Sequence, residues 1–256
     1  MIGNEVIILF FLNKFKTSNY WIIGKHAVNA ALNNKRRAKY RLCITPENQE
    51  KININILELK PEIMSRSEIS KLTDNDFHQG IALLTKPLEK QNLNSYLKQN
   101  IDIKKIFIIL DQINDSQNIG AIIRSAAAFS VSGIIMLDKN SPNENSTLSK
   151  AAVGTLEIMP IFKVNNLVQT IKLLKKNNFW TIGLEAQATK TLKEINDSTK
   201  LLSDNVAIAM GSESKGLRNL VKDNCDITAR INIKNSVESL NVSVALGISL
   251  YEMNRS

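Results

Sequence analysis

Short apolar runs alternate with amphipathic stretches along the second half of the chain. Apolar runs of strand length occupy residues 106–110, 133–137, 158–162, 180–184 and 206–210. Apolar positions with helical spacing occupy residues 119–129, 146–152 and 167–176. Continuous apolar strands separated by helices are typical of a parallel sheet that is covered on both faces. We therefore predict an α/β domain with a mostly parallel sheet over residues 106–256.

The first third of the chain predicts a smaller α/β unit over residues 18–87. Its strand patterns lie at 21–24, 40–44 and 80–84, and its helical patterns lie at 26–32 and 67–72. Residues 88–105 are polar and form the best candidate linker, although Leu93 to Leu97 could be helical. The apolar run from Val6 to Leu12 is about a third of the length needed to span a bilayer. We interpret residues 1–17 as an extension outside the fold.

The last stretch of the chain begins polar and then becomes helical. One apolar face carries Val242, Ala245, Leu246, Ser249 and Leu250, and a second carries Val244, Ile248 and Tyr251. Two apolar faces predict that most of this helix is buried. Polar side chains crowd its start, at Ser236, Ser239 and Asn241. A helix cap accounts for one or two of them, so the third indicates a possible site.

Charge points to a polyanionic partner. The chain of 256 residues has 33 Lys and Arg against 24 Asp and Glu, a formal charge of +9, and 43% apolar residues for a core. Such an excess is common in proteins that bind nucleic acid, although a basic solvated surface would also account for it. The densest basic cluster consists of Lys35, Arg36, Arg37, Lys39 and Arg41. We predict that this cluster contacts RNA phosphates; a solvated helix end is the alternative.

Cysteine and histidine are too few for a metal or disulfide framework. Cys43 and Cys225 form no CxxC pair, and the histidines are His26 and His78. A zinc site and a disulfide are therefore both disfavoured. We expect no metal and a reducing, cytoplasmic location.

Three polar loops follow predicted strands, where parallel sheets bind ligands. The first loop leads into a helix that carries Asn118, Gly120 and Arg124. Asn118 could cap this helix, and Gly120 permits close backbone approach. Arg124 lies in an otherwise apolar run, where a charge is costly unless it is paired. A substrate or phosphate contact and a structural salt bridge both remain open for Arg124.

The second loop, 211–218, follows the strand at 206–210. Gly211 and Gly216 frame a tight turn, but the sequence matches neither the P-loop nor GxGxxG. Glu213 could be a cap or a ligand for a ribose hydroxyl. The third loop is the polar start of the last helix.

Together the three loops form an ordered set of motifs. They read Asn-x-Gly-x-x-x-Arg, Met-Gly-Ser-Glu-x-x-Gly-Leu and Ser-Leu-Asn-Val-Ser-Val-Ala. This set resembles the SpoU (TrmH) family of RNA ribose 2′-O-methyltransferases over about residues 106–256. The front unit, with Gly24-Lys25-His26-Ala27-Val28 and His78-Gln79-Gly80, resembles that family's small, ribosomal-protein-like substrate-binding domain. Members with this domain mostly modify ribosomal RNA guanosines, including those of 23S RNA, and members without it tend to modify transfer RNA.

The resemblance implies a SPOUT-type domain with a trefoil knot, which pattern reading alone would not propose because knots are rare. It implies S-adenosylmethionine as cofactor, held near Gly211, Ile231 and Leu240. It also implies a homodimer packed through the knotted domains, with the last helix in the interface. No membrane partner is expected.

The resemblance further implies a catalytic set of residues. Arg124 would lie at the reacting 2′-hydroxyl or its phosphate. Electrostatic activation suits it better than a role as base, because guanidinium rarely loses its proton. The other members would orient ribose, loop and cofactor, and they are Asn118, Glu213, Ser239 and Asn241.

Three positions depart from the family pattern. Ser214 and Asn235 stand where Gly is common, and Asn232 stands where Pro is common. They alter loops around the expected cofactor site. Two alternatives to the leading interpretation stay open. One is a methyltransferase for transfer RNA or another ribosomal nucleotide, and the other is a non-catalytic RNA-binding factor for ribosome assembly.

Overall fold

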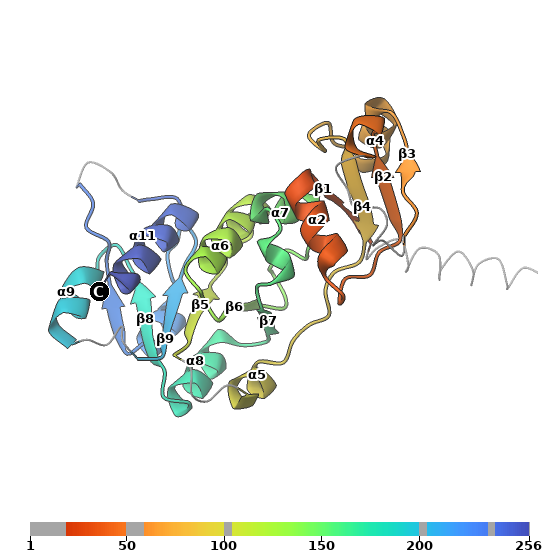
Figure 1. The fold of residues 1–256 in the computed structure, drawn as a ribbon. Helices are drawn as coiled ribbons and strands as arrows, with labels where there is room; N and C mark the ends of the chain where they lie inside the picture. The colour runs from red at the N-terminus through yellow and green to blue at the C-terminus, as the bar shows by residue number, and fades with distance from the viewer. Residues whose placement is uncertain (1–18, 50–58, 100–103, 200–203, 235–238, 256) are drawn as a thin grey trace, which may run out of the picture. The chain divides into compact units, whose positions relative to one another are not determined.

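The computed structural model describes residues 19–49, 59–99, 104–199, 204–234 and 239–255 (Figure 1). Its contacts divide the chain into two compact units. The first unit comprises Met1–Glu89 and Asn143–Glu157, and the second comprises Lys90–Pro142 and Ile158–Ser256. The extension predicted at 1–17 lies outside the described residues. The segment Asn143–Glu157 was expected in the C-terminal domain, but it packs with the N-terminal unit.

The first unit is a four-stranded sheet with helices on both faces. Its elements are β1 (Tyr20–Ile23), α2 (Lys25–Asn33), β2 (Arg41–Ile44), α3 (Pro46–Gln49), β3 (Glu62–Ile63), α4 (Arg66–Thr73), β4 (Ile81–Thr85), α7 (Ser146–Ala152) and the 3₁₀ turn η2 (Thr155–Glu157). The strand order is β1-β4-β2-β3. β4 runs antiparallel to β1 and β2, and β3 runs parallel to β2.

Alternating side chains give this sheet two small cores. Ile22, Leu42 and Leu83 pack with the buried face of α2. Their sequence neighbours Ile23, Cys43 and Ala82 pack on the other face with Ile69 of α4. Successive strand residues point to opposite faces, so each strand supplies both cores.

A buried ion-pair network fastens the later segment to this unit. The side chain of Arg37 is 0% exposed, and its guanidinium lies 2.7 Å from carboxylate oxygens of both Glu144 and Glu157. Arg37 also donates to the Lys86 carbonyl at 2.9 Å. Since one arginine satisfies two acids that precede and follow α7, the chain between them is held against the N-terminal sheet.

The second unit is a six-stranded parallel sheet. Its elements are α5 (Leu93–Gln99), β5 (Ile106–Leu110), α6 (Ser116–Ala128), β6 (Gly133–Leu137), β7 (Ile161–Val164), α8 (Leu167–Lys176), β8 (Trp180–Leu184), α9 (Leu192–Thr199), β9 (Val206–Met210), α10 (Asn219–Asn224), β10 (Ile227–Ala229) and α11 (Val242–Asn254). The order is β10-β8-β9-β5-β6-β7, and all neighbours are parallel. The predicted mostly parallel sheet is confirmed.

Helices cover both faces of this sheet (Figure 1). Phe107 and Ala209 share one core with the buried residues of α5, α8 and α10. Ile108 and Ile208 are fully buried and point to the opposite face, where α6 and α11 pack against each other. Leu93 and Leu97 of α5 belong to the first of these cores, so part of the predicted linker is structural.

Other expectations need correction. The strand predicted at 158–162 begins at Ile161, because Ile158 is 71% exposed and Pro160 intervenes. The second apolar face of α11 is open in the single chain, with Val244 51%, Ile248 41% and Tyr251 62% exposed. The knot stays a prediction, since the segment 235–238 leading into α11 lies outside the described residues.

Candidate functional site

Helix α6 positions Asn118 without using it as a cap. Asp115 is the N-cap, and its carboxylate accepts from Gln117 N at 2.8 Å. Asn118 is therefore the third residue of the helix, and the expectation that it caps α6 is wrong. Its side chain projects from the first turn and is available for contacts outside the helix.

Backbone crowding shapes the loop after β9. A Cβ atom on Gly211 would lie 1.9 Å from the carbonyl carbon of Gly216. Gly216 has φ of +63°, and its N–H donates to the Ser212 carbonyl at 2.8 Å. Only glycine allows two backbone segments to approach this closely, so the turn is specified by its two glycines.

A buried carboxylate ties this loop to the loop after β5. Asp111 is fully buried, and its Oδ1 accepts from Arg218 Nε at 2.8 Å while its Oδ2 accepts from Arg218 N at 3.0 Å. The Arg218 side chain is 43% exposed while that of Asp111 is buried, so removing Arg218 would leave a buried carboxylate without its charge partner. We did not assign either residue from sequence. The signal that could have identified Asp111 is its position as an acidic residue directly after an apolar strand.

Three motifs meet at the start of α11. Oε1 of Glu213 accepts from Asn241 Nδ2 at 2.8 Å, from Asn118 Nδ2 at 3.2 Å and from Val242 N at 3.1 Å. Asn241 Nδ2 also donates to Asn118 Oδ1 at 2.9 Å. We call Asn118, Glu213 and Asn241 the three-motif cluster. It joins residues up to 123 positions apart in the sequence.

Capping and electrostatics both favour this arrangement. Asn241 is the N-cap of α11, and its Oδ1 accepts from Ser243 N at 3.0 Å. The Glu213 carboxylate lies at the positive end of a helix of 13 residues. Glu213 accepts from the first backbone N–H of α11, which agrees with the capping role predicted for it, while its role as a ligand for a ribose hydroxyl stays a prediction.

Two expected site residues stand apart from the cluster. Arg124 is exposed on α6, so it needs no buried partner, and the expectation of a costly buried charge is wrong. Ser239 is exposed two positions before Asn241. Within the described residues, neither side chain is hydrogen-bonded or ion-paired to a member of the three-motif cluster.

The residues expected to hold a cofactor lie on three segments. Gly211 directly follows β9, Ile231 follows β10 by two positions, and Leu240 precedes Asn241. All three are half-buried. β9 and β10 both flank β8 and run parallel, so their ends meet at one edge of the sheet, and the cluster ties Leu240 to the loop after β9. Half-buried backbone groups from converging segments suit a ligand held mainly by main-chain contacts.

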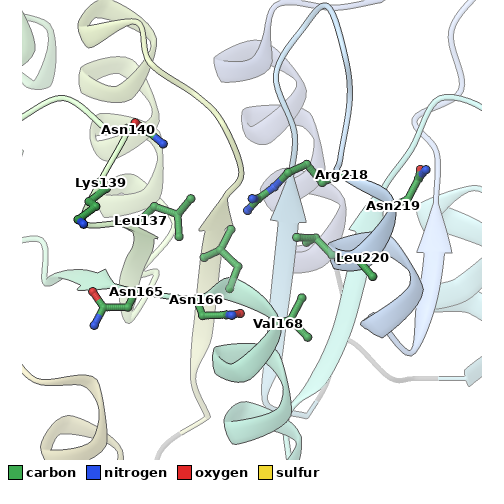
Figure 2. A pocket seen from close by; sticks show the side chains of 11 residues that line it. Leu137, Lys139, Asn140, Asn165, Asn166, Val168, Arg218, Asn219 and Leu220 are labelled. Carbon is green, nitrogen blue, oxygen red and sulfur yellow. The ribbon is translucent and has the colours of Figure 1, made fainter.

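A recess lies at the same edge of the sheet, next to the end of the loop that carries Glu213. The strand-end recess has a volume of about 700 Å³ and is lined by Leu137, Lys139, Asn140, Asn165, Asn166, Leu167, Val168, Arg218, Asn219, Leu220 and Val221. Figure 2 shows the Arg218 guanidinium and the Asn166 amide pointing into it. A second hollow of about 440 Å³ shares Leu137, Asn140 and Arg218 and adds Gln112 and Asn114. Pattern reading did not identify the recess, because its lining residues come from elements that are distant in the sequence.

The members of the basic cluster predicted to contact RNA lie in different environments in the structure. The guanidinium of Arg37 is buried in its ion pairs and cannot reach a phosphate, so this prediction is wrong for Arg37. Arg41 makes a two-bond contact with Glu62, at 2.9 Å and 2.7 Å. Lys35 and Arg36 are exposed and Lys39 is half-buried, and RNA contact stays a prediction for the four others.

The thiols are unsuited to chemistry at neutral pH. Burial raises the pKa of Cys225 to about 11 and also raises the pKa of Cys43. Among the described residues, no group of three or more His, Cys, Asp and Glu side chains is arranged to hold a metal ion. In the same part of the chain, no helix has the length and apolar character needed to cross a membrane.

Comparison with known families decides the identity. The profile of the SpoU rRNA Methylase family matches residues 105–251. The chain belongs to the SpoU rRNA methylase family. A second profile, described as RNA 2′-O ribose methyltransferase substrate binding, matches residues 21–91 of this SpoU protein. The resemblance seen in the three motifs is thereby confirmed.

Individual relatives agree with this assignment. The 23S rRNA (guanosine-2′-O-)-methyltransferase RlmB of Coxiella burnetii is 35% identical over 91% of this SpoU chain and 94% of its own. The structure of the SpoU methyltransferase AviRb from Streptomyces viridochromogenes with AdoMet has a TM-score of 0.76 at 17% identity, covering 94% and 91% of the two chains. The A. aeolicus TrmH/SpoU tRNA modifying enzyme covers only 64% of this chain and 83% of its own, with a TM-score of 0.52 at 24% identity.

Proposed function

We propose that this SpoU protein transfers a methyl group from S-adenosylmethionine to the ribose 2′-hydroxyl of a guanosine in 23S ribosomal RNA. The observation that carries the proposal is the three-motif cluster, which joins the three family motifs by direct hydrogen bonds. Similarity to the C. burnetii guanosine methyltransferase over 91% of the chain supports the choice of substrate. Ribosomal RNA as substrate implies a cytoplasmic reaction.

The proposed cofactor would bind at the edge of the sheet formed by β8, β9 and β10. Main-chain groups near Gly211, Ile231 and Leu240 would hold it. When bound, the cofactor supplies the methyl group, whose bond to the sulfonium sulfur breaks as its bond to the ribose oxygen forms, and the hydroxyl proton leaves to water. The chain's contribution is to position both reactants, which converts a bimolecular step into one within a complex.

The cluster residues would orient the ribose. Asn118 and Asn241 already hold the Glu213 carboxylate, so this carboxylate enters the reaction with a fixed direction. Ser239 would add a hydroxyl at the same helix start. Arg124 is exposed and would stabilise negative charge at the reacting oxygen or at the adjoining phosphate.

The strand-end recess would hold the RNA strand next to the target. Lys139 and Arg218 supply positive charge, and the asparagine amides can donate to and accept from ribose and base edges. The guanidinium of Arg218 is oriented by buried Asp111, which lowers the entropy cost of binding a phosphate. Arg218 lines the recess and directly follows the loop that carries Glu213, so a strand in the recess would lead toward the cluster.

The exposed face of α11 supports a homodimer. Val244, Ile248 and Tyr251 lie along one side of the helix and remain open in the single chain. Burying such a face against its copy would remove apolar surface from water. We expect sedimentation velocity to give a dimer for the wild type and a monomer for the double variant V244E/Y251E. A dimer in both would place the interface elsewhere.

Two other functions are tested in the same assay. One is methylation of transfer RNA or of another ribosomal nucleotide, and the other is a non-catalytic role in ribosome assembly. Labelled methyl transfer to unmodified ribosomal RNA and, separately, to unmodified transfer RNA distinguishes them, with nuclease mapping of the product. Label on a 23S guanosine ribose supports the proposal, and label only on transfer RNA contradicts the substrate. If neither RNA is labelled and the protein does not bind the cofactor, the non-catalytic assembly role is favoured.

A further inference from the structure

Phe77 is a solvent-exposed aromatic side chain. It lies between α4 and β4, and 73% of it is exposed, the largest fraction among the large apolar side chains in the described part of the chain. Single exposed apolar residues are normal on protein surfaces. Phe77 differs from these because its backbone is fixed and a cation stands beside its ring.

The loop that carries Phe77 is fixed on both sides. Asn75 Oδ1 accepts from Phe77 N at 2.8 Å. On the other side, the buried ring of His78 accepts from Gly80 N at 3.0 Å through Nδ1 and pairs with Ser70 Oγ at 3.1 Å through Nε2. A side chain presented by an ordered loop loses little conformational freedom on binding, so a ligand stacked on it gains affinity.

One cation lies beside the ring. Nζ of Lys150, on α7, lies 4.6 Å from the centroid of Phe77. Lys150 is exposed and makes no salt bridge with any residue that the structure describes. The loop therefore offers an apolar ring with positive charge beside it.

The surroundings of Phe77 suit a base better than a protein. The loop reads Asp74-Asn75-Asp76-Phe77-His78-Gln79, and Phe77 is its one exposed apolar side chain. A protein interface needs a larger apolar patch. Asp74 and Asp76 are unfavourable for a purely phosphate-binding surface. Stacking on an aromatic ring is how proteins hold unpaired RNA bases, and it does not depend on a strongly positive surface.

We infer that Phe77 is a stacking platform for an unpaired base of the RNA substrate, with Lys150 placed for the adjoining phosphate. This inference rests on the proposed function, which makes the first unit a substrate-binding domain. It adds a defined base contact to the unit that matches the substrate-binding profile.

The test compares variants of the full chain in RNA binding and in methyl transfer. For Phe77→Ala we expect Kd and KM for the RNA to rise about tenfold, with kcat and S-adenosylmethionine binding unchanged. Phe77→Trp should restore affinity, and RNA should quench the emission of the added tryptophan. Leu72→Ala removes exposed apolar surface from α4 without removing a ring, and it should leave Kd unchanged. Lys150→Ala should reduce the slope of log Kd against log salt concentration by about one.

The outcomes separate this inference from the proposed function. Equal Kd for wild type and Phe77→Ala, or no quenching in Phe77→Trp, would overturn the platform even if methylation proceeds normally. If the wild type methylates no RNA but Phe77→Ala still weakens binding, the proposed function fails and the platform stands. A loss caused equally by Leu72→Ala would show that apolar area is responsible, and this too would overturn it.

Discussion

The side-chain amide of Asn241 donates to the carboxylate of Glu213 at 2.8 Å, so the start of the last helix is bonded to the loop after β9. The same carboxylate oxygen accepts from Asn118 and from the backbone of Val242. One acid thus holds together three segments that carry the family motifs.

Among substitutions in the three-motif cluster, Glu213→Ala should reduce catalysis the most. Three donors lose their acceptor, so we expect kcat/KM to fall about 100-fold. Glu213→Gln keeps an acceptor oxygen and should lose about tenfold. Methyl transfer to the RNA substrate measures both. Asp223→Asn, an exposed carboxylate on α10, is the matched control and should be as active as the wild type. A fully active Glu213→Ala would remove the carboxylate from the reaction.

Arg124→Ala should separate chemistry from cofactor binding. The side chain is exposed on α6 and supports neither core, so the protein should fold normally. We expect kcat to fall about 100-fold while calorimetry gives an unchanged Kd for S-adenosylmethionine. Lys98→Ala removes an exposed cation from α5 and serves as the control. Normal turnover by the Arg124 variant would contradict its assignment.

Gly211→Ala should distort the loop after β9. The added Cβ would lie 1.9 Å from the Gly216 carbonyl carbon, a distance that forces the backbone apart. Because this loop is expected to contact the cofactor, we expect its Kd for S-adenosylmethionine to rise at least about tenfold, or about 1.4 kcal/mol. Ser212→Ala changes the next residue without adding bulk and should bind normally. Unchanged binding by the glycine variant would place the cofactor elsewhere.

The stability of the first unit should depend on the protonation of His78. Burial, and then the positive charge of Arg66, lower the pKa of His78 below its ordinary value of 6.5. The unfolded chain therefore binds a proton more readily than the folded chain. Stability is fully present above pH 6.5 and is lost as the pH falls through the lower folded pKa. Protonation also removes the Nδ1 lone pair that accepts from Gly80 N.

Urea unfolding of the wild type and His78→Gln at pH 7.5 and pH 5.5 measures this effect. The wild type should lose more stability than the variant on acidification, because glutamine does not titrate. An equal loss in both proteins would assign the acid sensitivity to other groups.

Lys139→Ala should weaken RNA binding uniformly. Lys139 lines the strand-end recess and lies outside the three-motif cluster. If it contacts a phosphate, its loss should raise KM severalfold, leave kcat unchanged and reduce the salt slope of binding by about one. Lys172→Ala, on the exposed face of α8 and outside the recess, is the control. Identical salt slopes for the two variants would contradict the assignment of the recess to RNA.

The elements of the second unit were largely predictable from the sequence. The bounds of β5, β6, β8, β9 and α8 coincide with the predicted ones, as do those of α7 in the first unit. Strands buried on both faces must be continuously apolar, so their ends are visible wherever polar residues begin. The short elements β3, α10 and β10 were not predicted, because two to six residues carry too little periodicity.

The candidate site was predictable only as separate motifs. Asn118, Glu213 and Asn241 were each identified from local spacing and resemblance, but their mutual hydrogen bonds depend on how the sheet brings strand ends together. The strand-end recess depends on the same placement. Spacing along the sequence does not reveal such contacts, since they join loops more than 25 residues apart.

By itself, the sequence determined the parallel sheet and the family, because apolar periodicity and ordered motifs are local properties of the chain. Only the tertiary structure decided which charges are available. It buries Arg37 between Glu144 and Glu157, although Arg37 lies in the densest basic run, and it leaves Arg124 exposed within an apolar run. The physical reason is that the cost of a charge depends on solvent and partners in three dimensions, and these are set by segments distant in the sequence.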